Sequence, residues 1–301
     1  MKALLLVLTS IFFAPVAFSQ PAGGEKIKIL SWNIYMLPGV LGSGNIARAE
    51  AIGELLSGHD YDVIVFQEAF DPRARKVISR LLNNHYPYQA GPANQKMLSV
   101  KINSGIWIFS RHPIRDAQSI VFATRRGIDA MSRKGALLCE LDVNNNRVQI
   151  VGTHLQNSGG SLVKQKQCAE IYTHLLRKFQ KPGVPQIVCG DFNINRHVIG
   201  DEYQSMLRAL DVVDSNTGSE RLYSYDRLNN DLHVEAGSGR DLIDYILIRN
   251  NFSLSGTERG RVRIFQKQWS ESHKDLSDHY SLETEVRLGN LTEVFTAASP
   301  R

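Results

Sequence analysis

The chain has 301 residues, of which 43% are hydrophobic and 22% are charged, and its formal charge is +5. Beyond the N-terminus no stretch approaches the ~20 apolar residues that a helix needs to cross a bilayer, which excludes a further membrane-spanning helix. The modest positive charge favours anionic partners without requiring nucleic acid.

The N-terminus has the pattern of a secretory signal peptide. Lys2 supplies a positive charge, residues 3–13 are apolar, and Ala17-Phe18-Ser19 forms a small-x-small cleavage site before Gln20. We expect residues 1–19 to be removed and the mature protein to be secreted or periplasmic. The alternative is a retained anchor, for which the apolar run is short. Loss of Lys2 lowers the formal charge to +4, and about 280 residues remain, enough for one large α/β domain.

Apolar, β-branched runs alternate with amphipathic stretches along the rest of the chain. The predicted strands are residues 26–32, 62–67, 105–110, 118–123, 135–143, 147–153, 185–190, 241–248 and 280–287. The predicted helices are residues 45–58, 71–84, 161–180 and 199–210. Many strands with few helices and no strict βαβ alternation predict two packed sheets with helices outside. We expect one domain over residues 25–289 and a C-terminal tail of residues 290–301.

Three cysteines remain in the mature chain: Cys139, Cys168 and Cys189. Cys139 and Cys189 lie within apolar strand patterns, and none of the three has metal-ligand spacing, so we expect buried free thiols. A single disulfide is the alternative, because an exported protein can form one.

Four short polar segments follow or end apolar, strand-like runs. They are Ser31-Trp32-Asn33, Phe66-Gln67-Glu68, Gly190-Asp191-Phe192-Asn193 and Ser277-Asp278-His279. Strands thus deliver Asn, Glu, Asp and His side chains to their ends, where these can converge. Oxygen ligands with one imidazole suit Mg²⁺ or Mn²⁺ and phosphate esters. Asp191 and Asn193, two residues apart, would point the same way in an extended segment; the alternative is a turn after the strand.

These four segments, in this order, resemble the endonuclease/exonuclease/phosphatase (deoxyribonuclease I-like) superfamily. Further elements resemble its neutral, Mg²⁺-dependent sphingomyelinase branch, namely Asn33–Pro38, Glu68–Asp71, Asp129 with Ser132–Gly135, and Gly152–Gln156. The resemblance covers residues 26–288. It implies an α/β fold, a four-layer α/β/β/α sandwich of two packed mixed β-sheets flanked by helices, with the site at one end of the sheets.

The resemblance also implies a Mg²⁺ site, with Mn²⁺ or Co²⁺ as substitutes. Glu68 and Asn33 would hold the principal ion, and Asp191, Asn193 and Asp278 would complete the ligands of metal or attacking water. The alternative for Glu68 is a structural acid, because a carboxylate at an apolar strand end needs some partner.

Two imidazoles receive catalytic roles by the same resemblance. His279 would be the general base, with Asp191 as the alternative proton acceptor, and Asp244 would orient His279 and fix its tautomer. His154, as an imidazolium, would stabilise the phosphoryl oxygens. The alternative is that both are satisfied structural residues.

Asn193 would also donate to a phosphate oxygen, and three more residues would contact substrate. In the sphingomyelinase branch a loop pair corresponding to Asp129 and Lys134 lies beside the site, where Lys134 can meet phosphate. An ordinary surface pair would contribute only about 0–1 kcal/mol. Asn103, just before a predicted strand, is another candidate phosphate donor.

The implied reaction is Mg²⁺-dependent hydrolysis of sphingomyelin or a related phosphosphingolipid to ceramide and a phosphorylated head group, by in-line attack of water. The head group is left open among choline, ethanolamine and inositol. A secreted nuclease of the same fold is the main alternative and would need a basic groove with stacking aromatics; we do not expect nucleic acid as a partner. A phosphoinositide phosphatase would carry a Cys-Asp-Arg signature that residues 241–245 lack. A non-catalytic lipid-binding module is the remaining alternative, and we expect a monomer.

One departure from the sphingomyelinase branch concerns membrane contact. Secreted bacterial members carry an aromatic-rich hairpin, whereas residues 249–276 offer only Phe252, Phe265 and Trp269, so avid insertion is not expected. Residues 36–41 are apolar and would either pack on helix 45–58 or dip into a lipid interface.

Overall fold

The computed structural model describes residues 25–39, 44–95, 102–125, 132–215, 223–233, 239–249 and 260–288. Five features discussed from the sequence therefore lie outside the described residues: the signal peptide, Asp129, the end of the apolar segment 36–41, Phe252 and the C-terminal tail. Among the helices that are described, none is long and apolar enough to cross a membrane.

The first sheet is mixed and has the strand order β13-β14-β1-β2-β4-β3. Its strands are β1 (Lys26–Met36), β2 (Val63–Ala69), β3 (Tyr88–Ala90), β4 (Trp107–Ser110), β13 (Arg261–Arg263) and β14 (Ser281–Arg287). β1 and β2 run parallel, whereas β14 is antiparallel to β1. The carboxyl ends of β1 and β2 and the start of β14 therefore meet at one edge.

The second sheet is also mixed and has the order β5-β6-β7-β8-β12-β9. Its strands are β5 (Ile114–Val121), β6 (Gly135–Val143), β7 (Asn146–His154), β8 (Gln186–Asp191), β9 (Val212–Asp214) and β12 (Asp244–Arg249). β7 and β8 are parallel and β12 is antiparallel to β8. A separate two-stranded ribbon pairs β10 (Tyr225–Asp226) with β11 (Arg240–Asp241).

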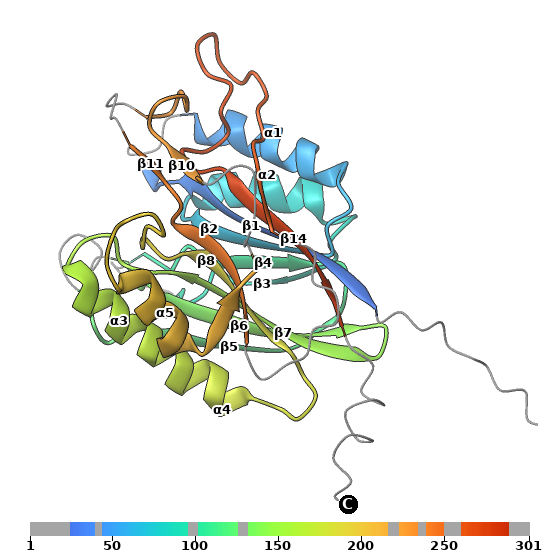
Figure 1. Cartoon of the computed structure of the whole chain (residues 1–301). Coiled ribbons are helices and arrows are strands. Elements are labelled where there is room, and N and C mark those ends of the chain that lie inside the picture. Colours follow the sequence, from blue (N-terminus) through green and yellow to red (C-terminus); the bar gives the residue numbers. More distant parts are fainter. Residues whose placement is uncertain are drawn as a thin grey trace, which may run out of the picture.

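Helices cover the outer face of each sheet (Figure 1). α1 (Asn45–Ser57) and α2 (Pro72–Leu82) pack on the first sheet. On the second lie α3 (Gly160–Ile171), its continuation through a π-helical turn (Tyr172–Leu176) into α4 (Arg177–Phe179), and α5 (Glu202–Leu210). α2 begins where the Asp71 carboxylate accepts the N–H of Arg73 and Pro72 fills the first helical position.

Three apolar layers hold these four layers of secondary structure together. One lies between the sheets and includes Val65, Ile150 and Ile187. The others fill the spaces between each sheet and its helices. The predicted four-layer sandwich is therefore confirmed, and so are the buried free thiols, because all three cysteines are buried and unpaired.

Several element boundaries differ from the prediction. β1 continues four residues further, to Met36, whose buried side chain packs in the same cluster as α1. Residues 199–201 precede α5 rather than forming its first turn. The predicted strand 241–248 divides into β11 and β12. Phe265 and Trp269 pack against the cluster beside α1 and α2.

A buried acid on β6 allows a prediction about the pH dependence of stability. The Glu140 carboxylate accepts hydrogen bonds from Lys181 (2.5 Å), Arg147 (2.6 Å) and Gln149 (3.0 Å). Burial opposes ionisation, but these donors outweigh it and hold the pKa of Glu140 below its usual value. Because the pKa of Glu140 falls on folding, its ionised carboxylate adds to the free energy of unfolding. This contribution is fully present above the ordinary carboxyl pKa and is lost as the pH falls through the folded-state pKa.

We therefore expect Glu140→Gln to lower the free energy of unfolding by about 1–3 kcal/mol at neutral pH, because the two cations lose their acceptor. The loss should be smaller at an acidic pH below the folded-state pKa of Glu140, where the wild-type carboxyl is protonated. Urea unfolding at both pH values measures it, and an equal loss at both would contradict this account.

Candidate active site

The strand ends at one edge of the two sheets bring the predicted site residues together. Asp191, at the end of β8, pairs in register with His154 at the end of β7 and with Asp244 at the start of β12. From the first sheet come Asn33 on β1 and Glu68 near the end of β2. The convergence follows from the topology, because parallel carboxyl ends and antiparallel starts share that edge.

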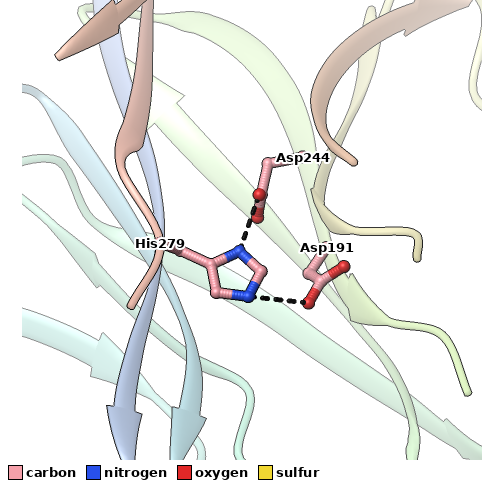
Figure 2. A group of neighbouring side chains, drawn as sticks. All are labelled: Asp191, Asp244 and His279. Atoms are coloured by element: carbon pink, nitrogen blue, oxygen red, sulfur yellow. Dashed lines mark hydrogen bonds and ion pairs between the residues drawn. The ribbon is translucent and has the colours of Figure 1, made fainter. Parts of the chain in front are cut away.

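His279 is held between two carboxylates (Figure 2). Its Nδ1 lies 2.8 Å from Asp244 Oδ2, and its Nε2 lies 3.7 Å from Asp191 Oδ2. Asp244 is fixed in turn by Ser224, whose hydroxyl donates to the same Oδ2 at 2.6 Å. The predicted contact between Asp244 and His279 is thus present, and it places the Nδ1 proton toward Asp244.

The surroundings of His279 make it a strong proton acceptor. Burial alone would lower its pKa, but the carboxylates of Asp244, Asp278 and Asp191 more than offset burial and raise the pKa well above its usual value. Nε2 is the atom left to exchange a proton in the cavity.

Glu68 is a half-buried acid whose buried carboxylate oxygen Oε2 is not stabilised by its neighbours. Within the described part of the chain its Oε2 has no hydrogen-bond partner. Burial, followed by the Asp278 carboxylate, raises the pKa of Glu68, although Lys134 and His279 oppose the rise. A bound cation would relieve both the burial and the repulsion, so the geometry fits a metal ligand better than a structural acid.

Asn33 and Asp191 join the two sheets across the site. The Asn33 amide donates to Asp191 Oδ2 at 3.2 Å, and its Oδ1 accepts the N–H of Tyr35. Burial and the neighbouring Asp244 carboxylate raise the pKa of Asp191. Together with Glu68 these groups form an oxygen-rich set of the kind that Mg²⁺ prefers.

Asp191 and Asn193 both face the cavity, but through a turn rather than an extended segment. Asp191 Oδ1 accepts the N–H of Asn193 at 2.8 Å, and Asn193 has a left-handed φ of 51°. This places the Asn193 amide nitrogen 3.2 Å from His154 Nε2 and 3.2 Å from the Leu155 carbonyl oxygen. The turn alternative is therefore confirmed, and both side chains line the cavity.

The surroundings of His154 favour a neutral imidazole over the imidazolium expected from the sequence. Burial, the Lys134 ammonium and His279 lower its pKa well below the usual value. Lys134 Nζ donates to His154 Nε2 at 3.1 Å and to the Leu155 carbonyl at 3.1 Å, and Nε2 also lies 3.4 Å from Asp191 Oδ2. Because the ammonium can only donate, we assign the imidazole proton to Nδ1, 3.9 Å from Glu68 Oε1. The positive charge in this corner belongs to Lys134, which is buried rather than on the surface.

Three residues at the cavity have left-handed backbone conformations: Tyr35 (φ 50°), Glu68 (φ 54°) and Asn193 (φ 51°). Asn tolerates this region, whereas Tyr and Glu adopt it at a cost of the order of 1–3 kcal/mol. The surrounding packing therefore imposes these conformations and aims Glu68 away from the regular alternation of β2.

Gly105 permits the close packing behind Glu68. A Cβ at position 105 would lie 3.0 Å from Glu68 Cα and 2.8 Å from the Phe70 ring. Asn103 Oδ1 accepts the N–H of Gly105 at 2.8 Å, so Asn103 shapes this turn. It does not line the cavity, and its contact with phosphate stays a prediction.

The site opens into a cavity of about 630 Å³. Its lining includes most of the predicted residues, namely Glu68, Lys134, His154, Asp191, Asn193, Asp278 and His279. Asn33 and Asp244 lie behind this lining.

The outer wall of the cavity was not anticipated. Tyr225, Arg227 and Asp241 line it, from the β10–β11 ribbon and its connections. The Tyr225 ring lies 4.8 Å from that of His279, and Arg227 pairs with Asp241 at 2.9 Å. Strands of two residues have no detectable periodicity, so the sequence offered little signal for this wall beyond its Tyr and Arg side chains.

A buried arginine connects the segments that carry the site. Arg48 on α1 donates to the carbonyls of Ile34 (3.0 Å), Tyr35 (2.6 Å) and Leu276 (3.0 Å). It thereby joins the end of β1 to the segment that leads to His279 and satisfies carbonyls that no strand partner reaches.

Comparison with known proteins places this geometry in a family. The model of the endonuclease/exonuclease/phosphatase family matches residues 30–279. A phospholipase C of Staphylococcus aureus is 28% identical over 208 residues, which are 62% of this chain and 62% of that protein. A sphingomyelinase C of Bacillus cereus is 26% identical over 301 residues, covering 88% of this chain and 90% of that one.

Solved structures show the same fold. A crystal structure of SmcL has a TM-score of 0.79 at 23% identity and covers 87% of this chain and 99% of its own. Staphylococcus aureus beta toxin with bound magnesium ions has a TM-score of 0.79 at 24% identity, over 86% and 99%. The family match spans the site from β1 to His279, and the chain therefore belongs to the endonuclease/exonuclease/phosphatase family.

Proposed function

We propose that the protein is a secreted, Mg²⁺-dependent phosphodiesterase that hydrolyses sphingomyelin or a related phosphosphingolipid to ceramide and a phosphorylated head group. The observation that carries the proposal is the cavity in which the unpaired Glu68 carboxylate oxygen faces the same space as the His279–Asp244 pair. The sphingomyelinase C relatives support the lipid substrate.

The metal would be held by Glu68 and Asn33, with Asp191, Asn193 and Asp278 supplying further ligands to it or to the attacking water. Once bound, it would neutralise the phosphoryl oxygens and the departing alkoxide. Mg²⁺ is proposed as the ion, with Mn²⁺ or Co²⁺ as substitutes, because the donors are oxygens.

The chain's own groups would manage the proton and the phosphoryl charge. In its neutral form, His279 would take the proton of the attacking water at Nε2, while Asp244 holds Nδ1. Lys134 supplies a buried positive charge, and the Asn193 amide and the Nδ1–H of neutral His154 supply further donors toward the equatorial oxygens. Preorganised donors of this kind need no reorientation during the reaction.

The test is a panel of substrates with Mg²⁺: sphingomyelin, ceramide phosphoethanolamine, phosphatidylcholine, inositol phosphates and plasmid DNA. Ceramide in the organic phase, from the first or second substrate, supports the proposal. Cleavage of DNA alone would favour the nuclease alternative.

Lys134 gives a prediction that separates a phosphate contact from a structural charge. Lys134→Ala should lower the turnover of a phosphodiester at least tenfold, about 1.4 kcal/mol in the barrier, because Lys134 carries the charge beside His154. Lys178→Ala, at an exposed lysine on α4, is the control and should leave turnover unchanged. Initial rates at saturating substrate measure both, and an unchanged Lys134→Ala rate would rule out the phosphate contact.

The proposal extends to processing and organisation. Residues 1–19 would be removed during export, leaving a catalytic domain of residues 25–289, a short tail and a monomer. N-terminal sequencing of protein from the culture medium tests the cleavage near Ser19-Gln20.

A further inference from the structure

The connection between β8 and α5 carries two adjacent exposed apolar residues. Val198 is 63% exposed and Ile199 fully so, which makes them the most exposed large apolar side chains in the described ranges. Single exposed apolar residues are ordinary. These two are consecutive, and Val198 lines the mouth of the cavity that contains Glu68 and His279.

Backbone and side-chain hydrogen bonds fix the base of this connection. The Arg196 N–H donates to the Leu242 carbonyl at 3.0 Å, and the Val198 N–H donates to the Asn195 carbonyl at 3.3 Å. Asn195 Oδ1 accepts the N–H of His197 at 3.0 Å, and its amide donates to Asp241. Because hydrogen bonds already fix residues 195–198 of this connection, binding through the two side chains loses little additional conformational entropy.

The charges around the two residues are paired within the protein. Arg196 contacts Asp214 at 3.4 Å, Lys164 contacts Glu202 at 3.4 Å, and Asp201 pairs with Arg208. Residues 198–200 carry no charge. The surface therefore suits an apolar layer beneath neutral head groups better than a polyanion, which would call for uncompensated cations.

We propose that Val198 and Ile199 form a docking tip that enters the interfacial layer of a zwitterionic lipid bilayer and holds the cavity mouth against the head groups. The inference rests on the proposed function, because a phosphosphingolipid must reach Glu68 and His279 from a bilayer surface. It assigns membrane contact to the β8–α5 connection rather than to Met36, Phe265 or Trp269, which pack in the cluster beside α1 and α2.

The first test measures sedimentation of the full mature chain with phosphatidylcholine vesicles that contain no sphingolipid. Ile199→Ser should weaken the partition coefficient about tenfold, because the most exposed apolar side chain is lost. Val213→Ser removes a comparable β-branched side chain, 51% exposed on β9, and should bind as wild type does. Binding should change little with salt, since insertion of uncharged residues releases no counterions.

A second variant gives a direct readout of insertion. Ile199→Trp should show a blue shift of the added fluorescence when vesicles are mixed in, because the indole moves into the interface. Val213→Trp should show none. Equal responses of the two variants, or equal partitioning of Ile199→Ser and wild type, would overturn the proposal.

The assays also distinguish failure of the docking tip from failure of the proposed function. Ile199→Ser should hydrolyse a soluble phosphodiester at the wild-type rate, because Ile199 does not line the cavity. If the wild type binds vesicles through Ile199 but shows no phosphodiesterase activity, the proposed function is rejected and the docking tip is supported. If the protein forms a dimer in the absence of vesicles and Ile199→Ser dissociates that dimer, the tip binds a second copy of the chain. That result would overturn the lipid assignment.

Discussion

Replacing Glu68 by Gln is expected to lower kcat/KM for sphingomyelin at least about a thousandfold, near 4 kcal/mol in the barrier. The substitution keeps the shape of the side chain but removes the carboxylate charge that faces the cavity. Because burial and the Asp278 carboxylate raise the pKa of Glu68, the charged form is disfavoured in the metal-free fold. The melting temperature of the metal-free variant should therefore equal or exceed that of wild type.

A ligand that binds only the folded state raises the melting temperature, so Mg²⁺ should stabilise the wild type more than Glu68→Gln. Glu50→Gln, at an exposed position on α1, is the matched control and should retain both activity and the Mg²⁺ response. Full activity of Glu68→Gln, or an unchanged Mg²⁺ response, would show that Glu68 is a structural acid.

Removing the imidazole of His279 is expected to cost about 100- to 10,000-fold in turnover, the range typical of a general base. Asp244→Asn should cost less, because the imidazole remains but its tautomer and orientation are no longer fixed. If the two residues act as a unit, the double variant should be barely worse than His279→Ala alone. Steady-state rates of the four proteins complete the cycle.

A second His–Asp pair serves as the control for this cycle. His112 lies 3.3 Å from Asp62 away from the cavity, and His112→Ala should leave turnover unchanged. Losses that multiply in the Asp244 and His279 double variant would mean that the two residues act independently.

Much of the site could be predicted from the sequence because its polar residues lie at the ends of recognisable strand patterns. Asn33, Glu68 and Asp191 lie at or near the ends of apolar strands, and mixed sheets bring such ends together wherever the connections are right. The pairing of Asp244 with His279, 35 residues apart, came from the family resemblance and is present in the structure. Local periodicity alone contains no information on that contact.

Other features depended on three-dimensional context that no local pattern encodes. Burial and the Lys134 ammonium, which is 20 residues away in the chain, lower the pKa of His154. The left-handed conformations of Tyr35 and Glu68 are imposed by packing against intrinsic preference. Tyr225 reaches His279 from a two-residue strand, which is too short to leave a periodic signal.

The most direct measurement of the central claim is the release of ceramide from sphingomyelin by the purified mature protein, with Mg²⁺, after removal of metal by EDTA, and after Mg²⁺ is restored. The account predicts turnover with Mg²⁺, loss of at least about a thousandfold in EDTA, and recovery on restoration. Full turnover in EDTA would contradict the metal-dependent mechanism built on Glu68.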